Sequence, residues 1–187
     1  SYPTSYIPTF GTSVTRNAEV CDNAGTSATF NDDEGVLFAE ISALVNESTV
    51  TKRITISDGT SSNRITIALS DELILGILVA QGSVNINQSF TYDTTQTNKI
   101  AFKYKVNDFS IFINGVKVHT DTSGDAFVGL NELRFDNGYS GSPFYGNTKQ
   151  LIVFDEALSD EELSDLTGQI NTTFNSLATF YGYTILS

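Results

Sequence analysis

The chain has 187 residues, with 10 Lys and Arg against 22 Asp and Glu and a formal net charge of -12 at pH 7. Such a surface repels a polyanion, so we expect no nucleic acid partner. No apolar run approaches the ~20 residues that span a bilayer, and the first residues lack the layout of a signal peptide, so we expect no membrane insertion. The length suits one domain with a full core, and we expect residues 1–187 to form it.

Runs of alternating apolar and polar residues predict strands along most of the chain, because successive side chains of a strand point to opposite faces of its sheet. The sequence therefore predicts an all-β fold. The expected strands lie at residues 13–20, 27–30, 36–45, 52–57, 63–69, 73–79, 84–92, 100–106, 109–113, 116–118, 131–136 and 149–154.

A tight hairpin is expected where Asn114 and Gly115 separate two alternating runs. This pair of residues is the best suited to the positive φ angles that both central positions of a type I′ turn require. We predict a two-residue type I′ turn at Asn114-Gly115.

The single histidine and the single cysteine do not indicate a catalytic or zinc site. His119 has no second His or free Cys beside it and no partnered nucleophile motif. We interpret it as a surface residue on the same side as Lys117. Together they belong to an expected basic patch of Lys103, Lys105, Lys117 and His119. Cys21 has no disulfide partner, and we interpret it as a small buried apolar residue.

An acidic turn runs from Asn31 to Gly35 and contains Asp32, Asp33 and Glu34. Three carboxylates beside an Asn supply the oxygen ligands that calcium prefers, although their spacing is not that of a regular calcium loop. Two interpretations stay open. One is a structural calcium ion that stabilises the fold without performing chemistry, and the other is a solvated turn.

The strand at residues 36–45 carries one carboxylate, Glu40. Retaining glycoside hydrolysis needs two carboxyl groups about 5 Å apart on one face. The positions two before and two after Glu40 are Phe38 and Ser42, so no second carboxylate shares its face nearby. The sequence therefore argues against retaining glycoside hydrolysis.

A polar ladder is expected on the hairpin of residues 52–57 and 63–69, with an Arg on each strand, Arg53 and Arg64. Guanidinium groups donate hydrogen bonds in pairs to hydroxyls and carboxylates, so this face suits a shallow polysaccharide site. The alternative is a face that is simply wet. The ladder consists of Arg53, Thr55, Ser57, Arg64, Thr66 and Ala68.

The longest loop mixes glycines with aromatic residues, from Asn137 to Asn147. Loops carry function more often than strands do, and an aromatic ring stacks on the apolar face of a sugar. We expect Tyr139 to be the stacking platform, with Asp136 and Asn137 as hydrogen-bonding partners. Tyr145 is a second candidate, with packing as an alternative role.

The sequence of the C-terminal region predicts two short helices within residues 159–181. Ser159 and Glu162 form a capping box, and Gly168 follows the expected end of the first helix. The second helix is expected at residues 172–180, with apolar residues at helical spacing. We expect both to pack at one edge of the β structure.

Three segments carry a resemblance to a known family: KIAFKYKVNDFSIFINGVKVHTDTSG, DGTSSNRI and FYGNTKQLIVFDEALSDEELSDLT. They resemble the concanavalin A-like (laminin-G-like) domains of tail-associated phage and prophage proteins. The opening SYIPTFGTSVTR is similar to the segment that introduces such domains, so residues 1–12 are expected to be introductory and the chain to be excised from a longer one. The resemblance implies a two-sheet antiparallel jelly-roll sandwich with short C-terminal helices.

The resemblance and the residues together predict a non-catalytic carbohydrate-recognition or adhesion module, because function depends on sites grafted on a fold. The expected partners are a cell-surface glycan, bound weakly and multivalently, and other domains or subunits of a parent protein. The expected location is extracellular or on a virion tail. The alternatives are a structural virion decoration domain without a ligand and a polysaccharide-degrading enzyme.

Overall fold

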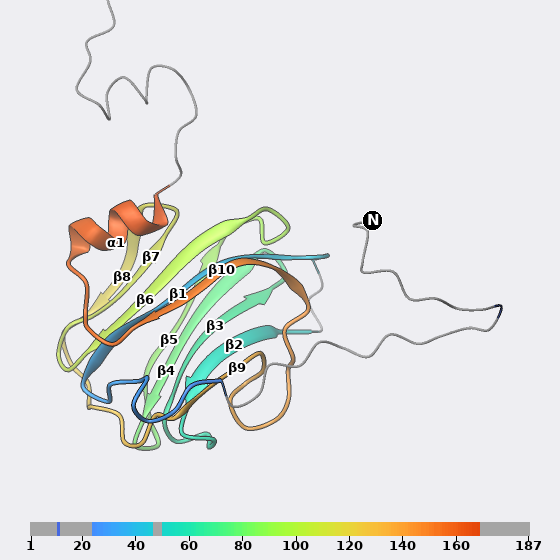
Figure 1. Cartoon of the computed structure of the whole chain (residues 1–187). Coiled ribbons are helices and arrows are strands. Elements are labelled where there is room, and N and C mark those ends of the chain that lie inside the picture. The colour runs from blue at the N-terminus through green and yellow to red at the C-terminus, as the bar shows by residue number, and fades with distance from the viewer. Residues whose placement is uncertain (1–10, 12–23, 47–49, 169–187) are drawn as a thin grey trace, which may run out of the picture.

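Two five-stranded antiparallel sheets lie face to face in the part of the chain that the structure describes (Figure 1). The computed structural model describes residue 11, residues 24–46 and residues 50–168. In sheet I the order is β10 (Gly146–Phe154), β1 (Glu34–Ala43), β6 (Asn98–Lys105), β7 (Phe109–Ile113) and β8 (Val116–Asp121). In sheet II it is β5 (Ser83–Thr91), β4 (Leu73–Ala80), β3 (Arg64–Ser70), β2 (Lys52–Ser57) and β9 (Glu132–Arg134). This arrangement confirms the predicted all-β jelly-roll sandwich.

The main core fills the space between the sheets, as the period-two patterns predict. Every strand of sheet II contributes inward-facing residues, among them Ile54, Ile65 and Ile74, and sheet I contributes Leu37 and Phe102. Gly76 belongs to this layer because a Cβ there would lie 2.4 Å from Cδ1 of Ile111 in the opposite sheet. The close approach of the two sheets at this point therefore requires a residue without a side chain.

The helix α1 (Asp160–Thr167) covers the outer face of sheet I over β6, β7 and β8 (Figure 1). A second, smaller apolar cluster forms under it, which explains why β1 is apolar on both faces. This cluster contains Val36, Phe38, Ala101, Phe112 and Leu163. The Ser159 hydroxyl accepts the Glu162 N–H and the Glu162 carboxylate accepts the Ser159 N–H, so the capping box is confirmed.

The Asn114-Gly115 turn is confirmed, with φ angles of 51° and 86°. Ile113 pairs with Val116 across it, so the loop has two residues. The helix docks directly on this turn. The Gly115 N–H donates to Oγ1 of Thr167 at 3.1 Å, and Oγ of Ser164 donates to the Gly115 carbonyl at 2.8 Å. The turn therefore fixes both the β7–β8 hairpin and the position of α1.

Residues 27–30 do not form the predicted strand. The chain turns there, with the Thr29 N–H donating to the Thr26 carbonyl at 2.8 Å. The hydroxyls of Thr26 and Thr29 also accept nearby N–H groups. Local hydrogen bonds of this kind occupy the amides that a ladder would need, and propensity alone does not reveal them. Only Ala24 makes a bridge to sheet II, at Leu133, in this part of the described chain.

The predicted basic patch is wrong in its inclusion of His119 and in its charge. The β7–β8 register shifts between Ile111 and Phe112, so Lys117 lies opposite Phe112 and His119 opposite Ile111, on different faces. His119 is half-buried and its Nε2 is buried. Carboxylates neutralise the lysines, since Lys103 pairs with Asp108, Lys105 with Glu34, and Lys117 with Asp160.

Several predicted features fall outside the described residues: the strand at 13–20, Cys21, most of the introductory segment and the second helix at 172–180. Within the described residues, no helix has the length and apolarity needed to cross a membrane.

Replacing Gly115 with Val is expected to destabilise the protein by about 1 kcal/mol or more, because a β-branched residue tolerates positive φ poorly. Gly115→Asn is the matched control. It adds the same Cβ, 3.3 Å from the Gly168 Cα, but Asn accepts the left-handed conformation. Urea unfolding of both variants measures the difference. Equal stability of the Val variant and the wild type would contradict the turn assignment.

Candidate functional site

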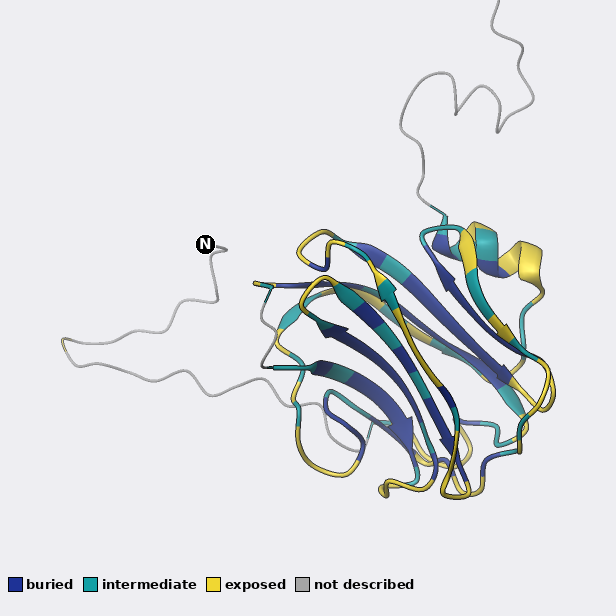
Figure 2. Cartoon of the chain, turned by 180° about the vertical axis from the view of Figure 1, so that it is seen from behind, coloured by how far each residue is buried: buried dark blue, intermediate teal, exposed yellow. Residues whose placement is uncertain are grey.

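The outer face of sheet II, which points away from the core, carries most of the predicted site residues. The register aligns Arg53 with Ala68, Thr55 with Thr66, and Ser57 with Arg64. The next strand adds Leu75 and Ile77, both half-buried, in the same rows. Beyond them β5, the most exposed strand of the sheet (Figure 2), presents Ser89 and Asn87. These rows form one surface from β2 to β5.

A loop at residues 136–141 folds back over the part of this surface formed by β2 and β3. Oγ1 of Thr55 donates to the Asp136 carbonyl at 2.7 Å, and Oγ of Ser57 donates to the Gly138 carbonyl at 3.0 Å. A Cβ on Gly138 would lie 2.9 Å from both side chains, so glycine permits the approach. The middle of the ladder is therefore neither wet nor available to a ligand. Thr55, Ser57 and Thr66 are completely buried.

Asp136 and Asn137 hold this loop in shape. The Asp136 carboxylate accepts the Arg134 Nε–H at 3.2 Å and the Gly138 N–H at 2.7 Å, and it is 8% exposed. Oδ1 of Asn137 accepts the Tyr139 N–H at 3.2 Å, while its own N–H donates to the Gly141 carbonyl. The structure thus places both residues beneath the loop surface, in supporting positions.

Tyr139 lies at the exposed tip of the loop, with 41% of the residue accessible. The Arg64 guanidinium carbon lies 5.3 Å from the centroid of its ring, within cation–π range. This contact links the loop to the sheet face. The ring is therefore held beside the arginine ladder and remains open to solvent.

Tyr145 lies elsewhere. It precedes Gly146, which opens β10 and pairs with Ala43 in sheet I, and it is 48% exposed. Its neighbour Phe144 packs edge-on against Phe135, with ring centroids 5.8 Å apart, and contacts the core. The structure thus separates the two candidate tyrosines, because Phe144 anchors the chain between them.

Arg53 flanks the site from β2. Burial lowers the pKa of its guanidinium from the ordinary value, the Tyr139 hydroxyl opposes this, and Arg64 adds a further lowering by repulsion. Arg53 thus interacts electrostatically with both Tyr139 and Arg64. The structure therefore brings together three of the predicted site residues: Arg53, Arg64 and Tyr139.

Sequence reasoning missed the role of Arg134. It bridges two carboxylates of the site region, pairing with Asp136 at 3.1 Å and Glu132 at 3.5 Å. The spacing indicated the Glu132–Arg134 pair, since side chains two residues apart on a strand point to the same face of the sheet. What the spacing could not show is that the chain bends after Arg134 and returns Asp136 to it.

The carboxylates of the acidic turn have separate partners. The Asp32 carboxylate accepts the N–H groups of Gly129 and Leu130 at 2.8 and 2.9 Å, and Glu34 pairs with Lys105 at 2.8 Å. The hydrogen bond from Lys105 lowers the pKa of Glu34.

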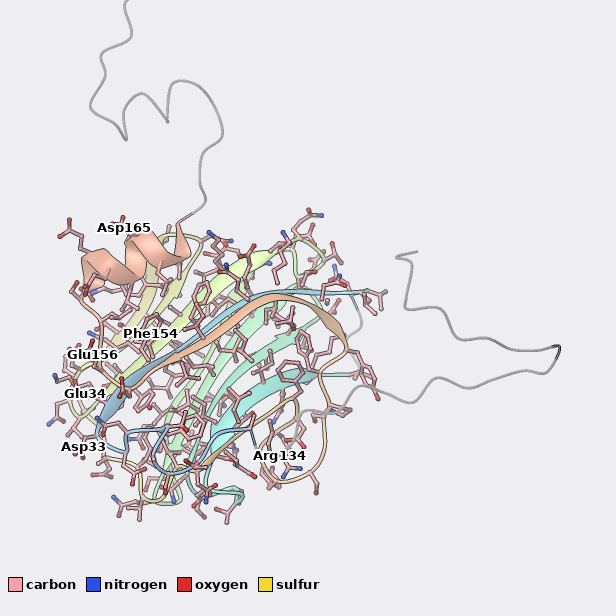
Figure 3. All side chains as sticks on the ribbon, viewed as in Figure 1. Asp33, Glu34, Arg134, Phe154, Glu156 and Asp165 are labelled. Atoms are coloured by element: carbon pink, nitrogen blue, oxygen red, sulfur yellow. The ribbon has the colours of Figure 1, made fainter. Side chains whose placement is uncertain are left out.

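Among the described residues, no group of three His, Cys, Asp or Glu is placed to hold a metal ion. Figure 3 shows Asp33 and Glu34 on the left of the view, away from Arg134, so this turn is no part of the candidate site. Structural calcium stays a prediction.

Glu40 has no carboxylate beside it on the adjacent strands. The register places Lys99 and Gln150 opposite it, and Lys149 lies 3.6 Å away. The paired carboxyl groups of a retaining hydrolase are therefore not formed around Glu40.

The fold resembles carbohydrate-associated domains of known structure. The IT-sialidase CBM40 of Ruminococcus gnavus matches with a TM-score of 0.62 at 16% identity, over 81% of this chain and 96% of that chain. Domain 4 of AbnA, a GH43 extracellular arabinanase from Geobacillus stearothermophilus, matches with a TM-score of 0.57 at 14% identity, over 76% and 70%. The NanB sialidase of Streptococcus pneumoniae matches with a TM-score of 0.57 at 16% identity, over 76% of this chain and 25% of that one. At these identities the likeness concerns the fold.

No curated protein sequence matches the chain. A family model does, over residues 41–164, which is more than half of the 187 residues and runs from β1 into α1. Its description is the concanavalin A-like lectin/glucanases superfamily. The sequence resemblance, the two-sheet sandwich and this match agree, and the chain belongs to the concanavalin A-like lectin/glucanase superfamily.

Proposed function

We propose that this chain is a non-catalytic carbohydrate-recognition module that binds a cell-surface glycan on the outer face of sheet II. The observation that carries the proposal is Tyr139, an exposed aromatic ring fixed beside Arg53 and Arg64. An aromatic ring offers a sugar an apolar surface, and guanidinium groups donate to its oxygens. Such a constellation suits binding and offers no acid–base pair for bond cleavage.

Domains of the same fold support the proposal, because their structures contain sugars. The CBM40 of Ruminococcus gnavus is described bound to α2,3 sialyllactose and to α2,6 sialyllactose, and domain 4 of AbnA is described in complex with arabinotriose. A sandwich of this kind is therefore a suitable scaffold for glycan recognition, while the site depends on the residues of each chain.

The site is open and shallow, so we expect a single domain to bind weakly. A dissociation constant near the millimolar level, equivalent to roughly 4 kcal/mol, is reasonable for a surface that buries little area and displaces ordered water. Several copies acting together would provide adhesion. This role fits an extracellular or virion tail-associated module, attached to other domains or subunits of a parent protein.

Tyr139→Ala is expected to abolish glycan binding and leave the melting temperature nearly unchanged, because the exposed ring contributes little to the core. Tyr145→Ala is the matched control, since Tyr145 is similarly exposed but lies beside β10. A glycan array followed by titration of the best ligand measures binding, and calorimetry measures stability.

Two results would decide against the proposal. A blank array for the intact chain would favour a structural decoration domain without a ligand. A Tyr139→Ala variant that keeps full affinity, while Tyr145→Ala loses it, would move the site to the start of β10.

Asp136→Asn tests whether the loop needs its ion pair. The substitution keeps an acceptor for the Gly138 N–H but removes the charge that faces Arg134, so we expect a loss of about 1.5 to 3 kcal/mol in the free energy of unfolding. Glycan affinity should fall as well, because Tyr139 would no longer be held in place. Asp125→Asn, which removes an exposed charge, should change neither quantity. If the Asp136→Asn variant matches the wild type in urea unfolding, the ion pair does not hold the loop.

A further inference from the structure

Arg53 and Arg64 are basic residues without a carboxylate partner in an acidic chain, which has 22 Asp and Glu for 10 Lys and Arg. Lys52 and Lys99 also lack such a partner among the described residues, but their ammonium groups donate to the carbonyls of Val50 and Gly168. In the described part of the chain, most other cations meet a carboxylate. The pairs are Lys103 with Asp108, Lys105 with Glu34, Lys117 with Asp160, Arg134 with Asp136, and Lys149 with Glu40. Neither Arg53 nor Arg64 forms an ion pair with a described residue.

The donors of these two arginines are poorly used. Arg64 donates from Nη1 to the Ser61 carbonyl at 2.6 Å, while its Nε is buried without a hydrogen-bond partner among the described residues. The Nε of Arg53 is buried in the same way. A guanidinium carries five N–H donors and no acceptor, so both side chains have donors that no described residue uses.

Two carboxylates of the site region have other partners. Glu132 and Asp136 belong to the same region, but Arg134 lies between them and pairs with both. The Asp136 carboxylate also accepts the Gly138 N–H. A guanidinium that is partly desolvated and has no counter-ion is unfavourable, and a bound anion would relieve this penalty at each arginine.

The groups around the two arginines indicate what kind of ligand would carry that anion. Tyr139 offers an exposed ring beside Arg64, and Leu75 and Ile77 offer half-buried apolar side chains on the next strand. Beyond them Asn87 and Ser89 offer exposed polar groups. Adjacent strands lie about 4.8 Å apart, so the surface from β2 to β5 spans roughly 14 Å, which suits a short oligosaccharide.

We propose that Arg53 and Arg64 bind the carboxylate of an acidic sugar, with Tyr139 against its ring and the neutral sugars that follow lying across β4 and β5. The inference rests on the proposed function and names the chemical class of its ligand. A carboxylate is favoured over a neutral hydroxyl because a planar anion matches the fork of a guanidinium and accepts charge-assisted hydrogen bonds.

The test uses matched probes on the intact chain, titrated by calorimetry. The carboxylate-bearing probes are trigalacturonic acid and sialyllactose, and their uncharged partners are the methyl ester of the former and lactose. Sulfated lactose is the third anionic probe. We expect at least one acid to bind about tenfold or more tighter than its neutral partner, and this preference to shrink in concentrated salt.

Arg53→Gln and Arg64→Gln are each expected to remove about tenfold of the affinity for the acid and to lower that for the neutral partner by a smaller factor. Lys149→Gln, which removes a cation from sheet I, is the control and should change neither. Melting temperatures of all variants report folding. The salt dependence of the wild type tests the same point without any substitution.

Each outcome has a distinct meaning. Equal binding of the acids and their neutral partners, or arginine variants that bind like the wild type, would overturn the inference and leave glycan recognition intact. Tight binding of sulfated lactose alone would replace the carboxylate by a sulfate. Binding to no probe and to no glycan of an array would contradict both the inference and the proposed function.

Discussion

The candidate site depends on the burial of three hydroxyl groups on the outer face of sheet II. Thr55, Ser57 and Thr66 are completely buried, and a buried hydroxyl without a partner is costly. Their partners are each other and the carbonyls of Asp136 and Gly138. The loop that carries Tyr139 is therefore held to the sheet by hydrogen bonds that these buried hydroxyls require. A binding platform on this loop is preorganised, because the energy that orders it comes from the fold and not from the ligand.

Much of the fold follows from the sequence, because burial on one face of a strand imposes period two and because a few turns have strict chemical requirements. The Asn114-Gly115 turn and the Ser159–Glu162 capping box are local, and both appear where they are predicted. The errors arise where one extra residue or a local side-chain bond decides the outcome. A bulge in β8 moves His119 to the opposite face from Lys117, and the hydroxyls of Thr26 and Thr29 replace a strand by a turn.

The candidate site was predictable in part for the same reason. Arg53, Arg64 and Tyr139 were identified by residue type, and the fold brings them together. Asp136 and Asn137 have the right chemistry for a ligand, yet the chain uses it to shape the loop. No local pattern distinguishes a carboxylate that serves a ligand from one that serves Arg134, because the choice is made by a bend that returns residue 136 to residue 134.

The position of the open surface follows from how the fold covers its two outer faces. The outer face of sheet I is apolar near α1, and the helix seals it over β6, β7 and β8 with Leu163 against Phe38 and Phe112. The outer face of sheet II carries buried hydroxyls on β2 and β3, and a loop in place of a helix covers them and supplies their partners. Beyond the loop the sheet carries half-buried Leu75 and Ile77 beside two arginines without carboxylate partners among the described residues. The helix thus covers the outer face of sheet I near β6 to β8. On sheet II the covering loop ends at the edge of the surface that a sugar would occupy.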